Sequence, residues 1–123
     1  MVQPRSLVVI ADNTGAKIGR VFKVLGGSKK RYACVGDLVV LSVQVAEPRK
    51  AVKKKEVLQA VVVRSTAAIR RKDGTYVRFD ENAVVILEKG KKDPKGGRIF
   101  GPIPREIGEL GYQKIASLAP EIV

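Results

Sequence analysis

The chain has 123 residues, which is enough for one domain and too few for two of ordinary size. Its 24 Lys and Arg against 12 Asp and Glu give a formal net charge of +12, and in a small domain this self-repulsion favours binding to a polyanion such as nucleic acid. The sequence has no His, no Trp and one Cys, which excludes Ser-His-Asp and Cys-His catalysis, His or multi-Cys zinc sites and an internal disulfide.

The first two-fifths of the chain predict three strands. Residues 6–11 form a short apolar run closed by the turn cluster Asp12-Asn13-Thr14-Gly15. Residues 17–25 alternate between apolar and basic side chains and stop at Gly26-Gly27. The third strand covers residues 38–46, because Pro48 offers no N–H to continue a ladder.

A basic segment, residues 49–55, carries five Lys or Arg in seven positions and is predicted as an exposed, mobile hairpin end with no part in the core. A fourth strand follows over residues 56–64. Asp73-Gly74 then predicts a tight hairpin in which both central positions need positive φ, with the chain returning over residues 75–79. Residues 83–87 form a last buried strand after a turn at residues 80–82.

Short strands at this spacing, without a βαβ rhythm, predict a mainly β fold built on a small antiparallel barrel. We expect a single domain over residues 1–123, with the barrel and ribbon in 1–87 and a loop and helices packed on the barrel in 88–123. Helical patterns cover residues 104–110, with Pro104 at the first helical position, and residues 113–118. The tail is expected to pack through Ile107, Leu110, Ile115 and Leu118.

Several residues that could suggest a catalytic or binding site are predicted to have ordinary structural roles. Cys34 is predicted to be a small buried hydrophobe. Gly26-Gly27-Ser28-Lys29 lacks the residue order of a phosphate-binding P-loop. Glu106 and Glu109 share a helix face but are predicted to be solvated or ion-paired, and not a catalytic acid and base. The apolar runs are far shorter than the roughly 20 residues of a membrane helix, and the N-terminus lacks a signal-peptide core, so a soluble, reducing, intracellular setting is expected.

The charge is concentrated in four connections, residues 29–31, 49–55, 70–72 and 89–98, which hold sixteen of the 24 basic residues. One such loop is ordinarily just solvated, but four in one small domain favour a surface for a polyanion. Phe22, Phe79 and Phe100 are predicted to lie inside, which disfavours a face of stacking rings. Phosphate and sugar contacts to a folded RNA, recognised by its shape, are therefore expected.

One spaced pattern identifies a family resemblance: Ala60 to Val63, nine residues, Asp73-Gly74, four residues, Phe79, two residues, Asn82, two residues and Val85-Ile86. It resembles the signature segment of the large-subunit ribosomal protein fourteen family. Further segments resemble the same family over essentially the full length: residues 11–16, 26–28, 31–33, 36–37, 98–102, 105–106, 114–115 and 117–121. The sequence departs from the family pattern at Pro104 and in the unusually basic residues 89–95.

The resemblance implies a small five-stranded antiparallel barrel with a projecting β-ribbon and short C-terminal helices. It also implies that the protein is a structural constituent of the large ribosomal subunit and binds large-subunit ribosomal RNA. It also implies contacts with small-subunit ribosomal RNA in intersubunit bridges, with ribosomal proteins three and nineteen, and with the ribosomal silencing factor. Neither an enzyme activity, a metal, a cofactor nor a membrane is expected. The implied location is the cytoplasm, in the large subunit of a bacterial ribosome, with a plastid ribosome less favoured.

Matching positions place RNA contacts at one set of residues: Gln3, Lys29, Lys30, Arg31, Arg49, Lys53, Lys54, Lys55, Arg64, Arg70, Arg71, Arg98 and Arg105. Arg98, Lys114 and Ser117 match the surface for the silencing factor. A different class of function, a free-standing nucleic-acid chaperone or architectural module built on the same barrel, stays open here. An enzyme is a third, weaker alternative.

Overall fold

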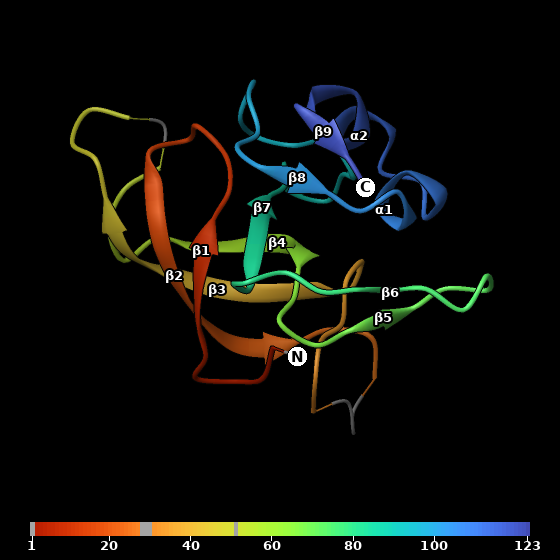
Figure 1. Cartoon of the computed structure of the whole chain (residues 1–123). Coiled ribbons are helices and arrows are strands. Elements are labelled where there is room, and N and C mark those ends of the chain that lie inside the picture. Colours follow the sequence, from red (N-terminus) through yellow and green to blue (C-terminus); the bar gives the residue numbers. More distant parts are fainter. Residues whose placement is uncertain (1, 28–30, 51) are drawn as a thin grey trace.

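The computed structural model describes residues 2–27, 31–50 and 52–123, and its centre is a closed barrel of five strands in the order β1-β2-β3-β4-β7 (Figure 1). Their bounds are β1 Leu7–Ile10, β2 Ala16–Val24, β3 Leu38–Ala46, β4 Val57–Arg64 and β7 Ala83–Ile86. Each lies within one residue of its predicted ends. The predicted mainly β barrel is therefore confirmed.

The barrel is not antiparallel throughout. Four neighbouring pairs are antiparallel, but β1 and β7 pair in parallel, with Val9 opposite Ala83 and Ile10 opposite Val84. An odd number of strands cannot alternate in direction around a closed ring, so at least one pair must be parallel. The prediction of an antiparallel barrel is wrong at this closing pair.

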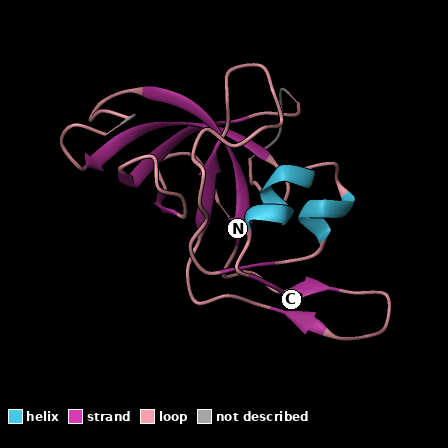
Figure 2. Cartoon of the chain, turned by 90° about the horizontal axis from the view of Figure 1, so that it is seen from above, coloured by secondary structure: helices cyan, strands magenta, loops and turns pink. Residues whose placement is uncertain are grey.

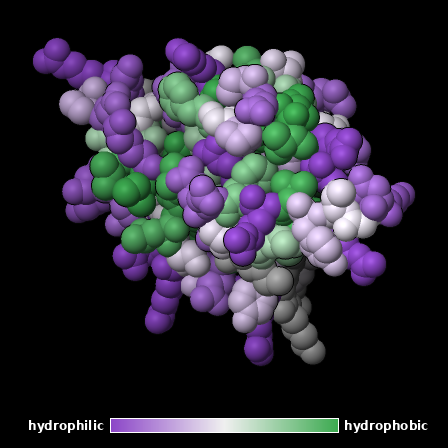
Figure 3. All heavy atoms as spheres, viewed as in Figure 1, coloured by the Kyte–Doolittle hydropathy of each residue, from purple (hydrophilic) through white to green (hydrophobic). Residues whose placement is uncertain are grey.

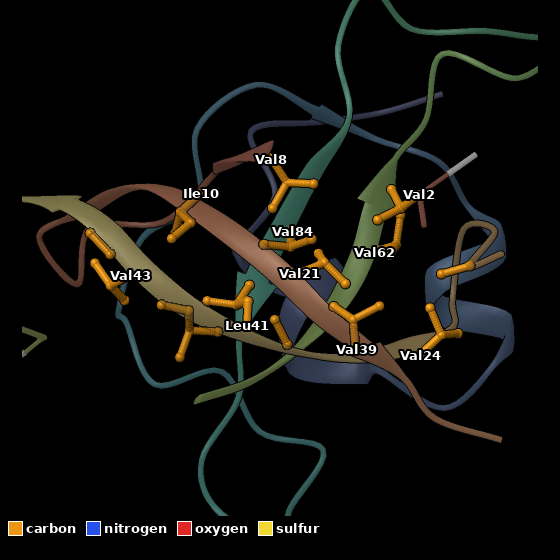
Figure 4. Packing of buried hydrophobic residues seen from close by; sticks show 14 of the residues in the cluster. Val2, Val8, Ile10, Val21, Val24, Val39, Leu41, Val43, Val62 and Val84 are labelled. Atoms are coloured by element: carbon orange, nitrogen blue, oxygen red, sulfur yellow. The ribbon is translucent and has the colours of Figure 1, made fainter. Parts of the chain in front are cut away.

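The barrel interior is filled by β-branched side chains from all five strands. Alternate residues of β3 point inward, so Val39, Leu41 and Val43 are completely buried, as are Val62 of β4 and Val84 of β7 (Figure 4). Period-two alternation places these residues on one face because successive side chains of a strand point to opposite sides. The valine-rich composition thus supplies the core directly.

A second core lies outside the barrel wall. Val61 and Val63 of β4 and Val85 of β7 point away from the interior, yet all three are fully buried. The C-terminal part covers them with a set of large side chains: Ile99, Ile103, Ile107, Tyr112 and Ile115. Burial on both faces explains why residues 60–63 read as one continuous apolar run.

The C-terminal part contains α1 Glu106–Glu109 and α2 Gln113–Leu118, packed against each other (Figure 2). Two short strands, β8 Pro102–Ile103 and β9 Glu121–Ile122, pair in parallel and were not predicted. Ile107 and Ile115 are fully buried and Leu118 partly, as expected. None of the helices in the described ranges is long and apolar enough to cross a membrane.

Three sequence predictions about this part and its neighbours are wrong. Leu110 is 51% exposed, because it follows the last residue of α1 and lies over Gly36 at the surface. Pro104 precedes the N-cap residue Arg105, so it stands outside the helix. Cys34 is exposed, since it occupies a turn where its N–H donates to the Asp37 carboxylate at 2.8 Å.

The ribbon β5 Ile69–Arg70 and β6 Tyr76–Val77 projects from the barrel (Figure 1). Its turn differs from the predicted one, because only Gly74 has positive φ, at +88°. The Gly74 N–H donates to the Arg71 carbonyl at 3.0 Å, and the Arg71 N–H donates to the Thr75 carbonyl at 2.9 Å. Asp73 instead accepts hydrogen bonds from the Thr75 N–H and hydroxyl, at 3.0 and 2.6 Å. This is a three-residue loop with one left-handed glycine.

Candidate nucleic-acid interface

Two of the basic connections lie at opposite ends of the barrel. The connections before and after β3 must leave from its two ends, so residues 31–37 and residues 47–50 are separated by the full length of that strand (Figure 1). Arg31, Arg49 and the lysines of 53–55 are exposed there. Gln3 is exposed beside the first loop, where the adjacent Val2 pairs with Ala33. Lys29 and Lys30 lie outside the described residues.

Residues 49–55 were predicted to be exposed, with no part in the core, and this prediction is wrong at Val52. The described part of the loop, residues 47–50 and 52–56, is folded onto the barrel. Val52 is completely buried, and its N–H donates to the Thr14 carbonyl at 3.2 Å. The Lys55 N–H donates to the Val43 carbonyl at 2.8 Å, and the Lys55 backbone has φ of +70°. One apolar residue within a basic run therefore anchors the loop, which holds the three lysine side chains outward at its turn.

The ribbon and the first helix form the rim of a pocket of about 430 Å³. Exposed Arg70 and Arg105 line it together with Lys72. Arg71, by contrast, is largely buried, and its Nε and Nη2 donate to the Glu106 carboxylate at 2.7 and 3.2 Å. Its Nη2 also donates to the Val123 carbonyl at 2.6 Å. Arg71 thus ties the ribbon to the helix and the C-terminus.

The ion pair between Arg71 and Glu106 shifts the pKa of both side chains. Burial of the Glu106 carboxyl disfavours its charged form, but the hydrogen bond from Arg71 and the charges of Arg71 and Arg105 outweigh it, so the pKa of Glu106 lies below its ordinary value. The hydrogen bond to Glu106 raises the pKa of Arg71. This pairing agrees with the prediction that Glu106 is ion-paired, although the partner is on the ribbon.

Arg64 is the predicted RNA-contacting residue that is placed farthest from solvent, at 6% exposed. Its Nη1 donates to the Phe100 carbonyl at 2.9 Å and to the Pro102 carbonyl at 3.4 Å, and Nη2 lies 3.3 Å from Glu81. Burial lowers the pKa of the guanidinium, and Glu81 opposes that shift. Gly101, with φ of +84°, packs so closely that a Cβ there would lie 2.0 Å from Nη1. Arg64 therefore locks residues 100–102 onto the barrel.

The sequence around Arg64 explains why this residue was predicted to lie among the surface cations. Nothing in its local pattern distinguishes a buried arginine from an exposed one at the end of a strand. Gly101 and the two carbonyls that accept hydrogen bonds from Arg64 lie at least 36 residues after it in the sequence.

Two of the phenylalanines predicted to be internal are not. Phe22 is 50% and Phe100 47% exposed, and Phe79 is half-buried. The Arg98 guanidinium carbon lies 5.4 Å from the centroid of the Phe100 ring. The prediction that Phe22 and Phe100 lie inside the protein, on which the argument against a face of stacking rings depended, is therefore wrong.

The residues matched to the silencing-factor surface divide between two elements. Lys114 and Ser117 are one helical turn apart on α2 and exposed. The Lys114 ammonium lies 3.4 Å from Asp93, and the Ser117 hydroxyl donates to the Lys114 carbonyl at 2.8 Å. Arg98 belongs to the segment before β8 and contacts Phe100.

On the face of the molecule that Figure 3 shows, hydrophilic side chains project around the outline and apolar groups lie between them. No cluster of three or more His, Cys, Asp or Glu able to hold a metal ion occurs within residues 2–27, 31–50 and 52–123. The geometry therefore offers cations on loops, one pocket beside the ribbon and one exposed ring with a stacked guanidinium.

The comparison with known families agrees with this geometry. The model of the family described as ribosomal protein L14p/L23e matches residues 1–123, the entire chain. The chain therefore belongs to the ribosomal protein L14p/L23e family, and with it to the structural proteins of the large ribosomal subunit. This is not an enzyme family.

Proposed function

We propose that this member of the ribosomal protein L14p/L23e family binds large-subunit ribosomal RNA through cations carried on the loops, while the valine-packed barrel fixes where those loops lie. The observation that carries the proposal is the exposure of Arg49 and Lys53 to Lys55 on one end of the barrel and Arg31 on the other. Cations at two separated ends contact phosphates of different RNA segments and so position the protein by shape.

The exposed and buried arginines take different parts in this proposal. Arg70, Arg98 and Arg105 are exposed and available for phosphates. Arg64 and Arg71 are engaged inside the protein by Phe100 and by Glu106. We assign these two the role of holding the RNA-facing segments in place.

Contacts beyond this RNA belong to the same proposal. The family supports residence in the large subunit, and the resemblance extends this to intersubunit bridges with small-subunit ribosomal RNA and to ribosomal proteins three and nineteen. The exposed pair Lys114 and Ser117 on α2, with Arg98, is the proposed surface for the silencing factor. Cross-links from Lys114 to that factor in purified large subunits test this assignment, and their absence under conditions where the factor is bound contradicts it.

The RNA proposal is tested by the salt dependence of binding. Neutralising about 6–10 phosphates makes the affinity fall by roughly 10³–10⁵ between 50 and 200 mM salt on the duplex-DNA scale. Replacing Lys53, Lys54 and Lys55 with Gln removes three charges while keeping most of each side chain. We expect the slope of log K against log salt to fall by up to about three units, with an unchanged melting temperature.

The control is Lys114→Gln, which removes a single lysine that is already paired with Asp93 and lies on α2. We expect a slope within about one unit of the wild type for this variant. An unchanged slope in the triple variant would show that residues 53–55 face solvent or protein in the complex.

The chaperone alternative predicts a different distribution in the cell. The family match favours stable residence in the large subunit. In sucrose gradients of cell extract, we expect the protein to sediment quantitatively with the large subunit. A protein found only at the top of the gradient would support the free-standing nucleic-acid chaperone.

A further inference from the structure

Phe100 presents half of its ring to solvent from a fixed backbone. Its N–H donates to the Ala11 carbonyl at 2.7 Å, and its carbonyl accepts from Arg64 at 2.9 Å. The preceding Ile99 is 2% exposed and pairs with Asp12. Exposure of this ring is therefore imposed by buried neighbours on both sides, and the ring does not sit on a loose loop.

The Arg98 guanidinium lies over this ring, and hydrogen bonds to Asn13 hold the Arg98 backbone in place. The Arg98 guanidinium carbon lies 5.4 Å from the ring centroid, and the Arg98 N–H donates to Asn13 Oδ1 at 3.2 Å. The same Asn13 oxygen accepts the Gly97 N–H at 3.0 Å. Asn13 thus fixes the backbone that carries Arg98 beside Phe100.

A hollow of about 150 Å³ opens beside the ring. Phe100 lines it together with Asn13, Lys17, Lys50 and Glu47. Drug-sized ligands occupy pockets of about 300–1,000 Å³, so this hollow suits one small planar group. An aromatic wall, a small volume and amine groups at the rim are the features that nucleotide-binding surfaces combine.

The charge around the hollow favours an anion at its rim. Lys17, Lys50 and Arg98 face two carboxylates, Glu47 and Asp12, an excess of one positive charge. Lys17 lies 2.9 Å from Glu47. The Asp12 carboxylate is buried and accepts hydrogen bonds from Ile86 and Thr14. Glu47 is paired with Lys17 and its charge also acts on Lys50, while Asp12 accepts only from uncharged groups. The net excess of one positive charge is therefore shared by the cations at the rim, Lys50 and Arg98 among them.

We propose that this hollow binds one unpaired base of large-subunit ribosomal RNA, stacked on the Phe100 ring, with a phosphate next to that base held by Arg98 and Lys50. The inference rests on the proposed RNA-binding function and adds a site to it. A protein side chain would cover the ring but leave the cations unused, whereas a nucleotide supplies both a flat π-face and an anionic phosphate.

The test separates stacking from charge. Phe100→Leu removes the aromatic face and keeps an apolar side chain, so we expect about tenfold weaker binding to the large-subunit RNA at every salt concentration. The slope of log K against log salt should stay at the wild-type value, because no phosphate contact is lost. Phe100→Tyr keeps the ring and should bind within about twofold of the wild type.

The matched control is Phe22→Leu, the same substitution at a ring of the same exposure on β2. We expect it to leave both affinity and slope unchanged. A chemical footprint of the RNA gives an independent readout: one unpaired base should be protected by the wild-type protein and by Phe100→Tyr, and exposed again with Phe100→Leu.

The outcomes are distinguishable. Wild-type protein that fails to bind the RNA, or binds with no salt dependence, overturns the proposed function and the base site together. Wild-type binding with an unaffected Phe100→Leu, or with equal losses for Phe22→Leu, overturns the base site alone. Weakened Phe100→Leu binding without a change in any base footprint also overturns it, because the ring would then support RNA binding without contacting an unpaired base.

Discussion

Replacing Arg64 with Met tests the view that this arginine belongs to the fold. The substitution removes the hydrogen bonds to the Phe100 and Pro102 carbonyls and the ion pair with Glu81, while the stem still packs among the buried neighbours. A buried acceptor left without a donor costs about 1–3 kcal/mol. The Pro102 contact, at 3.4 Å, is long and adds little.

Two features of the native site reduce this cost. Burial lowers the pKa of the guanidinium, so its charge is disfavoured where it lies, and its Nε has no hydrogen-bond partner in the described part of the chain. Met removes both penalties. Glu81 is half exposed, so its loss of a partner costs little. We therefore expect a net loss of about 1–2 kcal/mol from a total of roughly 5–15 kcal/mol.

Thermal and urea unfolding followed by circular dichroism at constant ionic strength measure this loss. At about 3–6 °C per kcal/mol for a chain of this size, the melting temperature should fall by roughly 3–12 °C. The control Arg70→Met, at an exposed position on β5, should stay within about 0.5 kcal/mol of the wild type. Equal stabilities for the two variants would refute the role of Arg64 as an internal lock.

Two further predictions concern the same junctions. Gly101→Ala should destabilise the protein by at least about 1–3 kcal/mol, because φ is +84° and the new Cβ meets Arg64, and the loss measured by urea unfolding should shrink in an Arg64→Met background. The pKa of Glu106 is lowered in the folded state, so its pairing with Arg71 stabilises the protein above the ordinary value of 4.5 and is lost as pH falls through the lower folded value. The stability difference between wild type and Glu106→Gln should therefore narrow as the pH falls below the ordinary value of 4.5, and a constant difference would show that the carboxyl is not ionised in its pairing with Arg71.

The local sequence pattern was sufficient to predict most of the barrel strands. Runs of Val and Ile closed by Gly, Pro and Asp-Asn clusters set strand ends to within one residue, because β-branched residues suit a pleated, buried surface and turn residues interrupt it. This result depends only on residues that are neighbours along the chain.

The burial of residues at the candidate interface could not be predicted from the local sequence where segments distant in the chain meet. Ile99 and Phe100 are both apolar, yet Ile99 is buried and Phe100 exposed, because the pairing of Ile99 with Asp12 fixes which of the two faces inward. Arg64 is buried only because Gly101 leaves room for its guanidinium. The parallel pairing of β8 with β9 joins two-residue segments that have no pattern of their own.

The amino-acid sequence by itself determined that this protein is a basic, valine-cored barrel with its cations on connections, because composition, period and turn residues are local properties. Only the tertiary structure decided which cations are available. Burial and partnership depend on groups that lie dozens of residues away, such as the carbonyls that hold Arg64 and the carboxylate that holds Arg71. The exposure of the Phe100 ring was decided in the same way, by contacts on both sides of it that no local pattern contains.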